Sequence, residues 1–167
     1  MRRSGRIGIL AAGAVIAAFG MMQLIPAKRT NPAIAIDSNG VNARDIAAPS
    51  EIEATLRRAC YDCHSDETHW PWYSAIAPVS WLVAHHVDLG RKEIDFSEWQ
   101  SYYPQTRRRK LEWMGRALRE EVMPPWPYRL MHPRARLSNE DRAALEQWVA
   151  AKVERPRGRM ATAPDRQ

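Results

Sequence analysis

Two cysteines and a histidine form the stretch of the chain with the clearest chemical potential. Residues 59–65 read A-C-Y-D-C-H-S, and Cys60 and Cys63 are the only cysteines among 167 residues. In the pattern C-x-x-C-H both thiols can add to the two vinyl groups of a haem, and the next imidazole can bind its iron. The motif therefore predicts covalently attached haem c, with Cys60 and Cys63 bound to the porphyrin and His64 as the proximal iron ligand.

Other uses of the same cysteine pair have different requirements. A structural zinc site needs two further ligands, and no second C-x-x-C or H-x₃₋₅-H pair is present. A thioredoxin-like redox pair follows a strand of a βαβ unit, and the sequence predicts no strand there. A structural disulfide between Cys60 and Cys63 stays open, and it would give a colourless protein.

A second iron ligand is best sought in the stretch E-V-M-P-P-W, residues 121–126. Met123 follows a predicted helix and precedes two prolines, which end the helix and stiffen the loop. A stiff loop can hold a weakly binding thioether near iron at little cost in conformational entropy. Met123 is therefore the expected distal ligand, with His85 or His86 as the alternatives. The other candidates by residue type are Met114, Met131, His69 and His132.

Helical periodicity dominates the region that must position these residues, and no stretch alternates convincingly with period two. The first predicted helix begins at Ser50, where Ser50 and Glu53 form a capping-box pattern. Its apolar positions lie on one face and lead to Cys60. This helix therefore delivers the first cysteine at its C-terminal end.

Three further helices follow from the same periodicity. We expect them at residues 79–89, 106–122 and 138–149. Gly90 is read as the stop of the first, and Ser138 with Asp141 forms a second capping box. The predicted fold class is therefore all-α, a small cytochrome-c-like helical domain around one covalently attached haem.

The N-terminal segment predicts a membrane anchor. Three arginines are followed by residues 7–25, which carry no charged side chain. A bilayer core needs about 20 apolar residues as a helix. A cleaved signal peptide is the alternative, although its apolar stretch is normally shorter, about 7–15 residues. We expect a transmembrane helix at residues 7–25 in the bacterial inner membrane, with the haem domain facing the periplasm.

Composition divides the remaining chain into three parts. Turn formers without a sustained period predict a linker at residues 26–49, and the helical pattern places the haem-binding domain at residues 50–153. The polar residues 154–167 are expected to form a disordered tail. The net charge is +6, but much of it lies at the two ends and no nucleic-acid-binding signature accompanies it. Nucleic acid is therefore not expected as a partner.

Several stretches between about residues 28 and 150 have a familiar combination: A-C-Y-D-C-H-S, W-P-W-Y-S-A-I-A-P-V-S-W-L, the pair His85-His86, and M-P-x-x-x-Y. They resemble the bacterial haem-binding domain family, c-type-cytochrome-like proteins that usually have an N-terminal membrane anchor. The resemblance implies haem c attached outside the cytoplasm at Cys60, Cys63 and His64. The segment around Met123 is also similar to the distal-ligand segment of class I cytochromes c.

Two classes of haem function are compatible with these residues. Two protein ligands on the iron would make the chain an electron carrier, which meets redox partner proteins at the membrane. An open or displaceable distal site would instead make it a haem-based sensor or a peroxidase-like enzyme. We expect the electron carrier rather than the enzyme.

Overall fold

The structure is a computed structural model that describes residues 2–38 and 40–154, and its regular elements are helices. The α-helices are α1 (Arg2–Met22), α2 (Ser50–Ala59), α3 (Tyr61–His64), α4 (Val79–Glu93), α5 (Pro104–Arg119), α6 (Trp126–Met131) and α7 (Asn139–Glu154). Three 3₁₀ turns complete them: η1 (Trp72–Ala75), η2 (Trp99–Ser101) and η3 (Pro133–Ala135). In these described residues β pairing is limited to one isolated bridge, between Ile36 and Asn42. The all-α prediction is confirmed.

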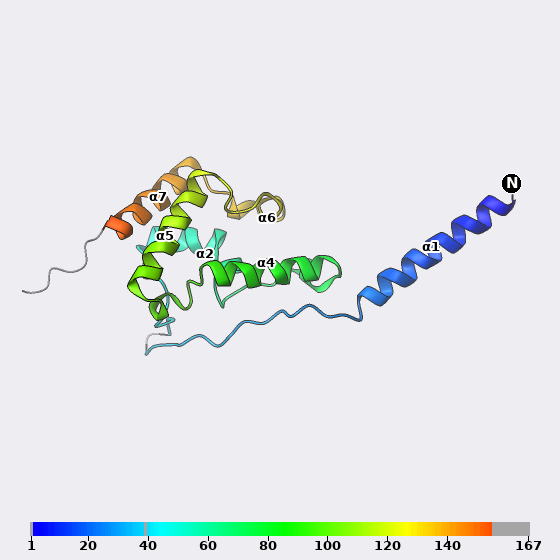
Figure 1. Ribbon diagram of the computed structural model, residues 1–167, viewed down its shortest axis with the longest axis horizontal. Helices are drawn as coiled ribbons and strands as arrows, with labels where there is room; N and C mark the ends of the chain where they lie inside the picture. The colour runs from blue at the N-terminus through cyan, green and yellow to red at the C-terminus, as the bar shows by residue number, and fades with distance from the viewer. Residues whose placement is uncertain (1, 39, 155–167) are drawn as a thin grey trace, which may run out of the picture.

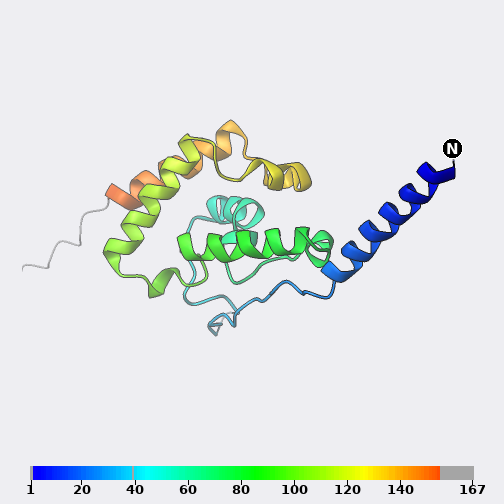
Figure 2. The same cartoon turned by 45° about the vertical axis from the view of Figure 1, so that its right-hand side comes forward.

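Helices α2 to α7 form one domain, and α1 projects away from it (Figures 1 and 2). Helix α5 packs along α7, while the short helix α3 packs against α4. The core between these elements consists of large apolar side chains: Ile46, Ile52, Leu56, Tyr61, Ile94, Phe96, Trp99, Leu111, Met114, Leu118, Leu145, Trp148 and Val149. This core supports α2, whose C-terminal end leads into α3.

The two predicted capping boxes have different outcomes. At the start of α7 the Ser138 hydroxyl accepts the Asp141 N–H at 3.0 Å, and the Asp141 carboxylate accepts the Ser138 N–H at 2.9 Å. This box is confirmed. At α2, Ser50 is already the first helical residue, and the Glu53 carboxylate accepts a hydrogen bond from Arg57 instead. The box predicted there is wrong.

Helix α4 continues through Gly90 to Glu93, so the prediction that Gly90 stops the helix is wrong. Gly90 is needed for another reason. A Cβ atom at this position would lie 2.9 Å from the carbonyl carbon of Cys63, closer than real Cβ contacts. The missing side chain therefore lets α4 approach the backbone of the cysteine motif.

The N-terminal helix differs from its prediction. In the part of the chain that the structure describes, no helix combines the length and the apolar character that a membrane crossing requires. Helix α1 begins among the arginines and ends at Met22. Its uncharged part, residues 7–22, spans about 24 Å at about 1.5 Å per residue, against ~30 Å for a bilayer core. The transmembrane helix expected at residues 7–25 is not found.

The segment after α1 is hydrogen-bonded to the helical domain. Gln23 and Ala77 exchange two hydrogen bonds, of 2.9 and 3.1 Å. Further along, the Asn31 amide donates to the carbonyl of Thr68 at 2.9 Å. The predicted linker therefore lies against the domain over much of its length.

The predicted domain boundaries stay predictions. The linker boundary at 49/50 coincides with the start of α2 at Ser50. Of the tail predicted for residues 154–167, Glu154 is the last residue of α7, and the others lie outside the described residues.

Candidate functional site

The backbone places Cys60, Cys63 and His64 on one turn. Cys60 follows the end of α2, and its carbonyl accepts the N–H of Cys63 at 3.1 Å and that of His64 at 2.9 Å. The three predicted attachment residues are thus brought together by the junction of α2 and α3. Their roles in haem attachment stay predictions.

The two thiols are free and partly buried. Burial raises the pKa of Cys60 to about 12 and that of Cys63 to about 11. Both groups therefore stay neutral thiols at ordinary pH, whereas zinc binding and disulfide exchange use the thiolate. The described residues also contain no cluster of three or more His, Cys, Asp or Glu side chains that could hold a metal ion. A pair of uncharged thioethers suits this environment better than a charged thiolate pair.

The imidazole of His64 has a defined orientation. Its Nδ1 atom lies 2.9 Å from the carbonyl oxygen of Gly90 and 3.1 Å from that of Ile94. Both partners only accept hydrogen bonds, so Nδ1 carries the proton and Nε2 keeps its lone pair. Burial also lowers the pKa of His64, which favours the neutral ring. A neutral imidazole held through Nδ1 by backbone carbonyls is the usual arrangement of a metal-binding histidine.

The residues that hold His64 come from α4 and the segment just after it. Besides the two carbonyls of Gly90 and Ile94, the Phe96 N–H donates to the His64 carbonyl at 2.8 Å. The Phe96 ring is buried and stacks on Tyr61 with centroids 5.3 Å apart. Sequence reasoning missed these positioning residues. The one available signal was Gly90, a glycine inside a helical pattern.

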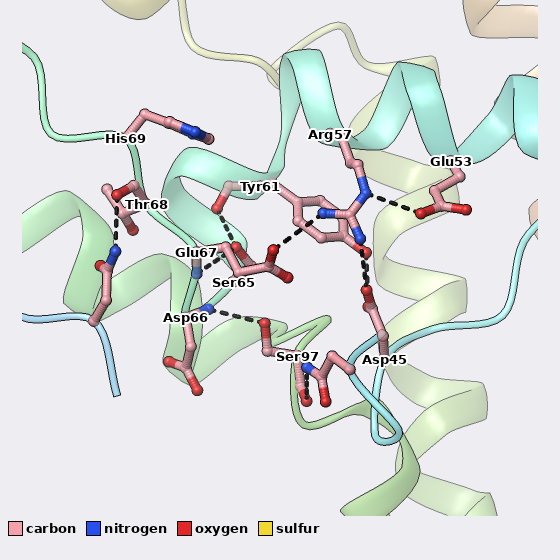
Figure 3. A network of polar contacts seen from close by, with 12 residues as sticks. Asp45, Glu53, Arg57, Tyr61, Ser65, Asp66, Glu67, Thr68, His69 and Ser97 are labelled. Atoms are coloured by element: carbon pink, nitrogen blue, oxygen red, sulfur yellow. Dashed lines mark hydrogen bonds and ion pairs between the residues drawn. The ribbon is translucent and has the colours of Figure 1, made fainter. Parts of the chain in front are cut away.

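A network of polar contacts anchors the motif from the side of α2 (Figure 3). The Tyr61 hydroxyl donates to Asp45 at 2.6 Å, and Arg57 pairs with the other oxygen of Asp45 at 3.2 Å. Burial and the Asp45 hydrogen bond raise the pKa of Tyr61. On the other side of the motif, the Ser97 hydroxyl accepts the Asp66 N–H at 3.0 Å. The turn that carries the cysteines is therefore fixed before and after His64.

The segment of Met123 is brought towards the motif by α6. The hydroxyl of Tyr128 donates to the carboxylate of Asp62, between the two cysteines, at 2.6 Å. Met123 lies five residues before Tyr128 and is partly buried. Its role as an iron ligand stays a prediction.

The other candidate ligands have different environments. Met114 is 7% exposed and belongs to the core. His85 and His86 are exposed on α4, the helix whose Gly90 carbonyl accepts the proton of Nδ1 of His64. Two more candidates are exposed, namely Met131 and His69, while His132 pairs with Tyr73 through a 2.6 Å hydrogen bond.

Large apolar side chains are exposed in two segments that contact each other near the motif. They are Trp72, Ile76, Val79 and Leu82 in the first segment, and Val122, Trp126, Leu130 and Met131 in the second. The hydrogen bond between Tyr73 and His132 joins the two segments. Exposed apolar side chains on adjoining segments are typical of a binding surface. With the two neutral thiols and the free Nε2 of His64, these residues fit a haem.

Comparison with known proteins gives an independent result. A family model described as a haem-binding domain matches residues 17–151. Among curated proteins, cytochrome c peroxidase of Escherichia coli (strain K12) is 26% identical over 117 residues, which is 66% of this chain and 24% of that protein. The chain thus spans about a quarter of the length of this relative. No solved structure matches the chain.

Proposed function

This chain belongs to the haem-binding domain family, and we propose that it holds haem c through Cys60, Cys63 and His64 and transfers electrons. The observation that carries the proposal is the orientation of His64, whose Nδ1 donates to two backbone carbonyls, so that Nε2 keeps its lone pair for a metal. When bound, a haem supplies an iron that takes up and releases one electron.

Different residues of the chain would attach the haem, bind its iron and shield it from water. The sulfurs of Cys60 and Cys63 would fix the group covalently, and their buried environment favours the uncharged thioether over a thiolate. Nε2 of His64 would bind the iron, and Gly90 and Ile94 would keep the ring from turning. The exposed aromatic and aliphatic side chains of the two neighbouring segments would cover the porphyrin and exclude water.

Met123 is the distal ligand in this proposal. Nδ1 of His64 faces α4, so Nε2 points away from that helix, and a second ligand must come from another element. This disfavours His85 and His86, which lie on α4 itself. The segment before α6 is the better source because Tyr128 ties α6 to the motif. Thioether ligation would raise the reduction potential relative to two imidazoles.

The proposed location is outside the cytoplasm, in the bacterial periplasm, where redox partner proteins would exchange electrons with the haem. Contact with the inner membrane surface is part of this proposal. Helix α1 exposes large apolar side chains along its length, including Ile7, Ile9, Leu10, Val15 and Ile16. Their exposure favours contact with lipid. Fractionation of cells, followed by a high-salt and a carbonate wash, tests whether the full chain stays with the membrane.

A haem enzyme of the peroxidase type is the second candidate. The observation in its favour is the similarity to the E. coli cytochrome c peroxidase, at 26% identity. It requires an open or displaceable distal position. The two candidates therefore differ in how the reduced protein reacts with carbon monoxide, which needs a free position on the iron.

The absorption spectrum of the full chain tests the proposal directly. The chain is produced in the periplasm of a host with haem-attachment machinery, and spectra are taken before and after acid–acetone extraction. Colour that resists extraction, low-spin bands and slow reaction with carbon monoxide are the expected results. A rapid reaction would favour the peroxidase-like or sensor function. A colourless protein with a Cys60–Cys63 disulfide would rule out haem attachment. The matched control is the double variant Cys60→Ala/Cys63→Ala, which should lose its colour on extraction.

A further inference from the structure

A short hydrogen bond links the attachment motif to α6. The Tyr128 hydroxyl of α6 donates to one carboxylate oxygen of Asp62 at 2.6 Å. The other oxygen of Asp62 accepts the backbone N–H of His69 at 3.0 Å. The Asp62 side chain is 19% exposed, and its bond to Tyr128 is partly buried whereas its bond to the His69 N–H is exposed. Asp62 thus connects the cysteine turn with α6 and with the loop that follows His64.

Tyr128 is itself held in place. Its ring stacks on that of His132, with centroids 4.3 Å apart and planes inclined by 16°. Nε2 of His132 is in turn 2.6 Å from the Tyr73 hydroxyl of η1. Burial and the Asp62 hydrogen bond raise the pKa of Tyr128, so its hydroxyl keeps its proton and remains a donor. The ring stack fixes the tyrosine, and the hydroxyl adds the contact with the motif.

The position of α6 is passed on to Met123 through a stiff stretch of chain. Pro124 and Pro125 are the only residues between Met123 and the first residue of α6. Proline fixes its own φ angle, and Pro125 has φ −66°. A shift of α6 therefore moves Met123 with it rather than being absorbed by a flexible loop.

We propose that the hydrogen bond between Tyr128 and Asp62 is a latch that holds the Met123 loop over the distal face of the haem. Tyr128 and Asp62 are then positioning residues for the sixth iron ligand. This inference rests on the proposed function, in which Met123 binds the iron. It assigns a role to Asp62, a residue of the C-x-x-C spacer that attachment chemistry does not use.

The expected size of the effect follows from the bond. A hydrogen bond to a charged group is stronger than one between neutral groups, and a tenfold change in an equilibrium constant corresponds to about 1.4 kcal/mol. Loss of the latch should therefore raise the fraction of molecules with a dissociated distal ligand by about tenfold or more. Carbon monoxide reports this fraction because it binds only when the distal position is open.

The test uses the full haem-loaded chain. The rate of carbon monoxide binding to the reduced protein is measured for the wild type, Tyr128→Phe, Asp62→Asn and the double variant. Tyr128→Phe keeps the ring and its stack on His132 and removes one oxygen. Tyr103→Phe is the matched control, since Tyr103 is 80% exposed. Each latch variant should react about tenfold faster, the double variant no faster than either single one, and the control should match the wild type.

The outcomes separate the latch from the proposed function. Wild-type colour that survives extraction, together with slow carbon monoxide binding, supports the function, and Tyr128→Phe then decides on the latch. An unchanged rate of carbon monoxide binding in Tyr128→Phe overturns the latch. This holds even if the free energy of unfolding of that variant falls, because the Tyr128–Asp62 hydrogen bond would then contribute to stability alone. A wild type that already reacts rapidly overturns both the Met123 ligation and the latch. If Asp62→Asn fails to attach haem, the carbon monoxide rate of Tyr128→Phe alone decides whether the latch exists.

Discussion

The backbone of Gly90 on α4 lies directly against the backbone of Cys63 in the cysteine motif. A Cβ atom added to Gly90 would lie 2.9 Å from the carbonyl carbon of Cys63 and 3.2 Å from its Cβ. The same close approach brings the Gly90 carbonyl to 2.9 Å from Nδ1 of His64. One missing side chain therefore sets both the spacing of α3 and α4 and the orientation of the proximal imidazole.

The variant Gly90→Ala should be less stable and should load less haem. An alanine gains about 1 kcal/mol in helix propensity, but overpacking against rigid backbone typically costs about 1–3 kcal/mol. Urea unfolding measures the free energy of unfolding, and the extracted and unextracted spectra give the haem content. Gly115→Ala is the control, because a Cβ there meets side-chain atoms of Val149 and Arg119 at 3.2 and 3.3 Å and no backbone atom of a neighbouring element. Equal stability and haem content in Gly90→Ala and the wild type would contradict this account of the contact.

Replacing Met123 should change the spin state. In Met123→Ala the iron loses its proposed sixth ligand, so the spectrum of the oxidised protein should move from low-spin to high-spin. Met21→Ala serves as the control, since Met21 is 63% exposed and lies on α1, away from the proposed haem site. A low-spin spectrum that persists in Met123→Ala would return the distal role to His85 or His86, and His85→Ala and His86→Ala would then identify which.

Glu121→Gly should stabilise the protein. Glu121 has φ 54° at the end of α5, in the left-handed region that costs a non-glycine residue roughly 1–2 kcal/mol. The hydrogen bonds from Val122 to Ala117 and from Glu121 to Leu118 close a Schellman motif, in which glycine is preferred at this position.

We expect Glu121→Gly to raise the free energy of unfolding by about 1 kcal/mol, measured in urea. Its ion pair with Arg142 is long, at 3.8 Å, and the carboxylate is 66% exposed, so its loss matters little. Glu121→Ala is the matched control, since it removes the same ion pair but keeps a Cβ. Should both variants show the same stability, backbone strain at this position is not the cause.

Asp95 should make stability depend on pH. Burial, with a further contribution from Asp66, raises the pKa of Asp95 to about 6, against about 3.9 in an unfolded chain. The folded protein therefore binds a proton more tightly than the unfolded one. Protonation of Asp95 therefore adds to the free energy of unfolding. This contribution is fully present below about pH 4 and is lost as the pH rises through about 6.

The variant Asp95→Asn isolates this effect. Its amide oxygen can still accept the Ser97 N–H, which lies 2.9 Å from the Asp95 carboxylate. Urea unfolding at about pH 4.5, 5.5 and 7 should show the wild type losing stability relative to Asp95→Asn over this range. Parallel pH profiles for the two proteins would show that Asp95 is not the group responsible.

The cysteine motif was predictable from the sequence because its geometry is local. Cys60, Cys63 and His64 are joined by hydrogen bonds within one turn, and a few neighbouring residues suffice to specify it. The carbonyls that orient His64 come from Gly90 and Ile94, about thirty positions away, and residue periodicity does not reveal such a contact. The long-range packing of α4 on α3 decides it.

Helix α6 was missed for a related reason. Pro124, Pro125 and Pro127 make the stretch look like an irregular loop, yet Pro127 lies in the first turn of the helix, where its missing N–H is tolerated. The same prolines suggested, correctly, that the segment is not a continuation of α5. The end of α5 is set by the left-handed conformation of Glu121, which a glutamate does not signal.

The hydrogen bonds of the segment after α1 affect how the whole molecule moves in solution. Gln23 is bonded to Ala77, and the Trp81 indole donates to the carbonyl of Ile25 at 2.9 Å. Rotation of the helical domain about its N-terminal helix is therefore restricted from the first residues after α1. The side of the domain that carries Ala77 and Trp81 is therefore held against the segment that follows α1.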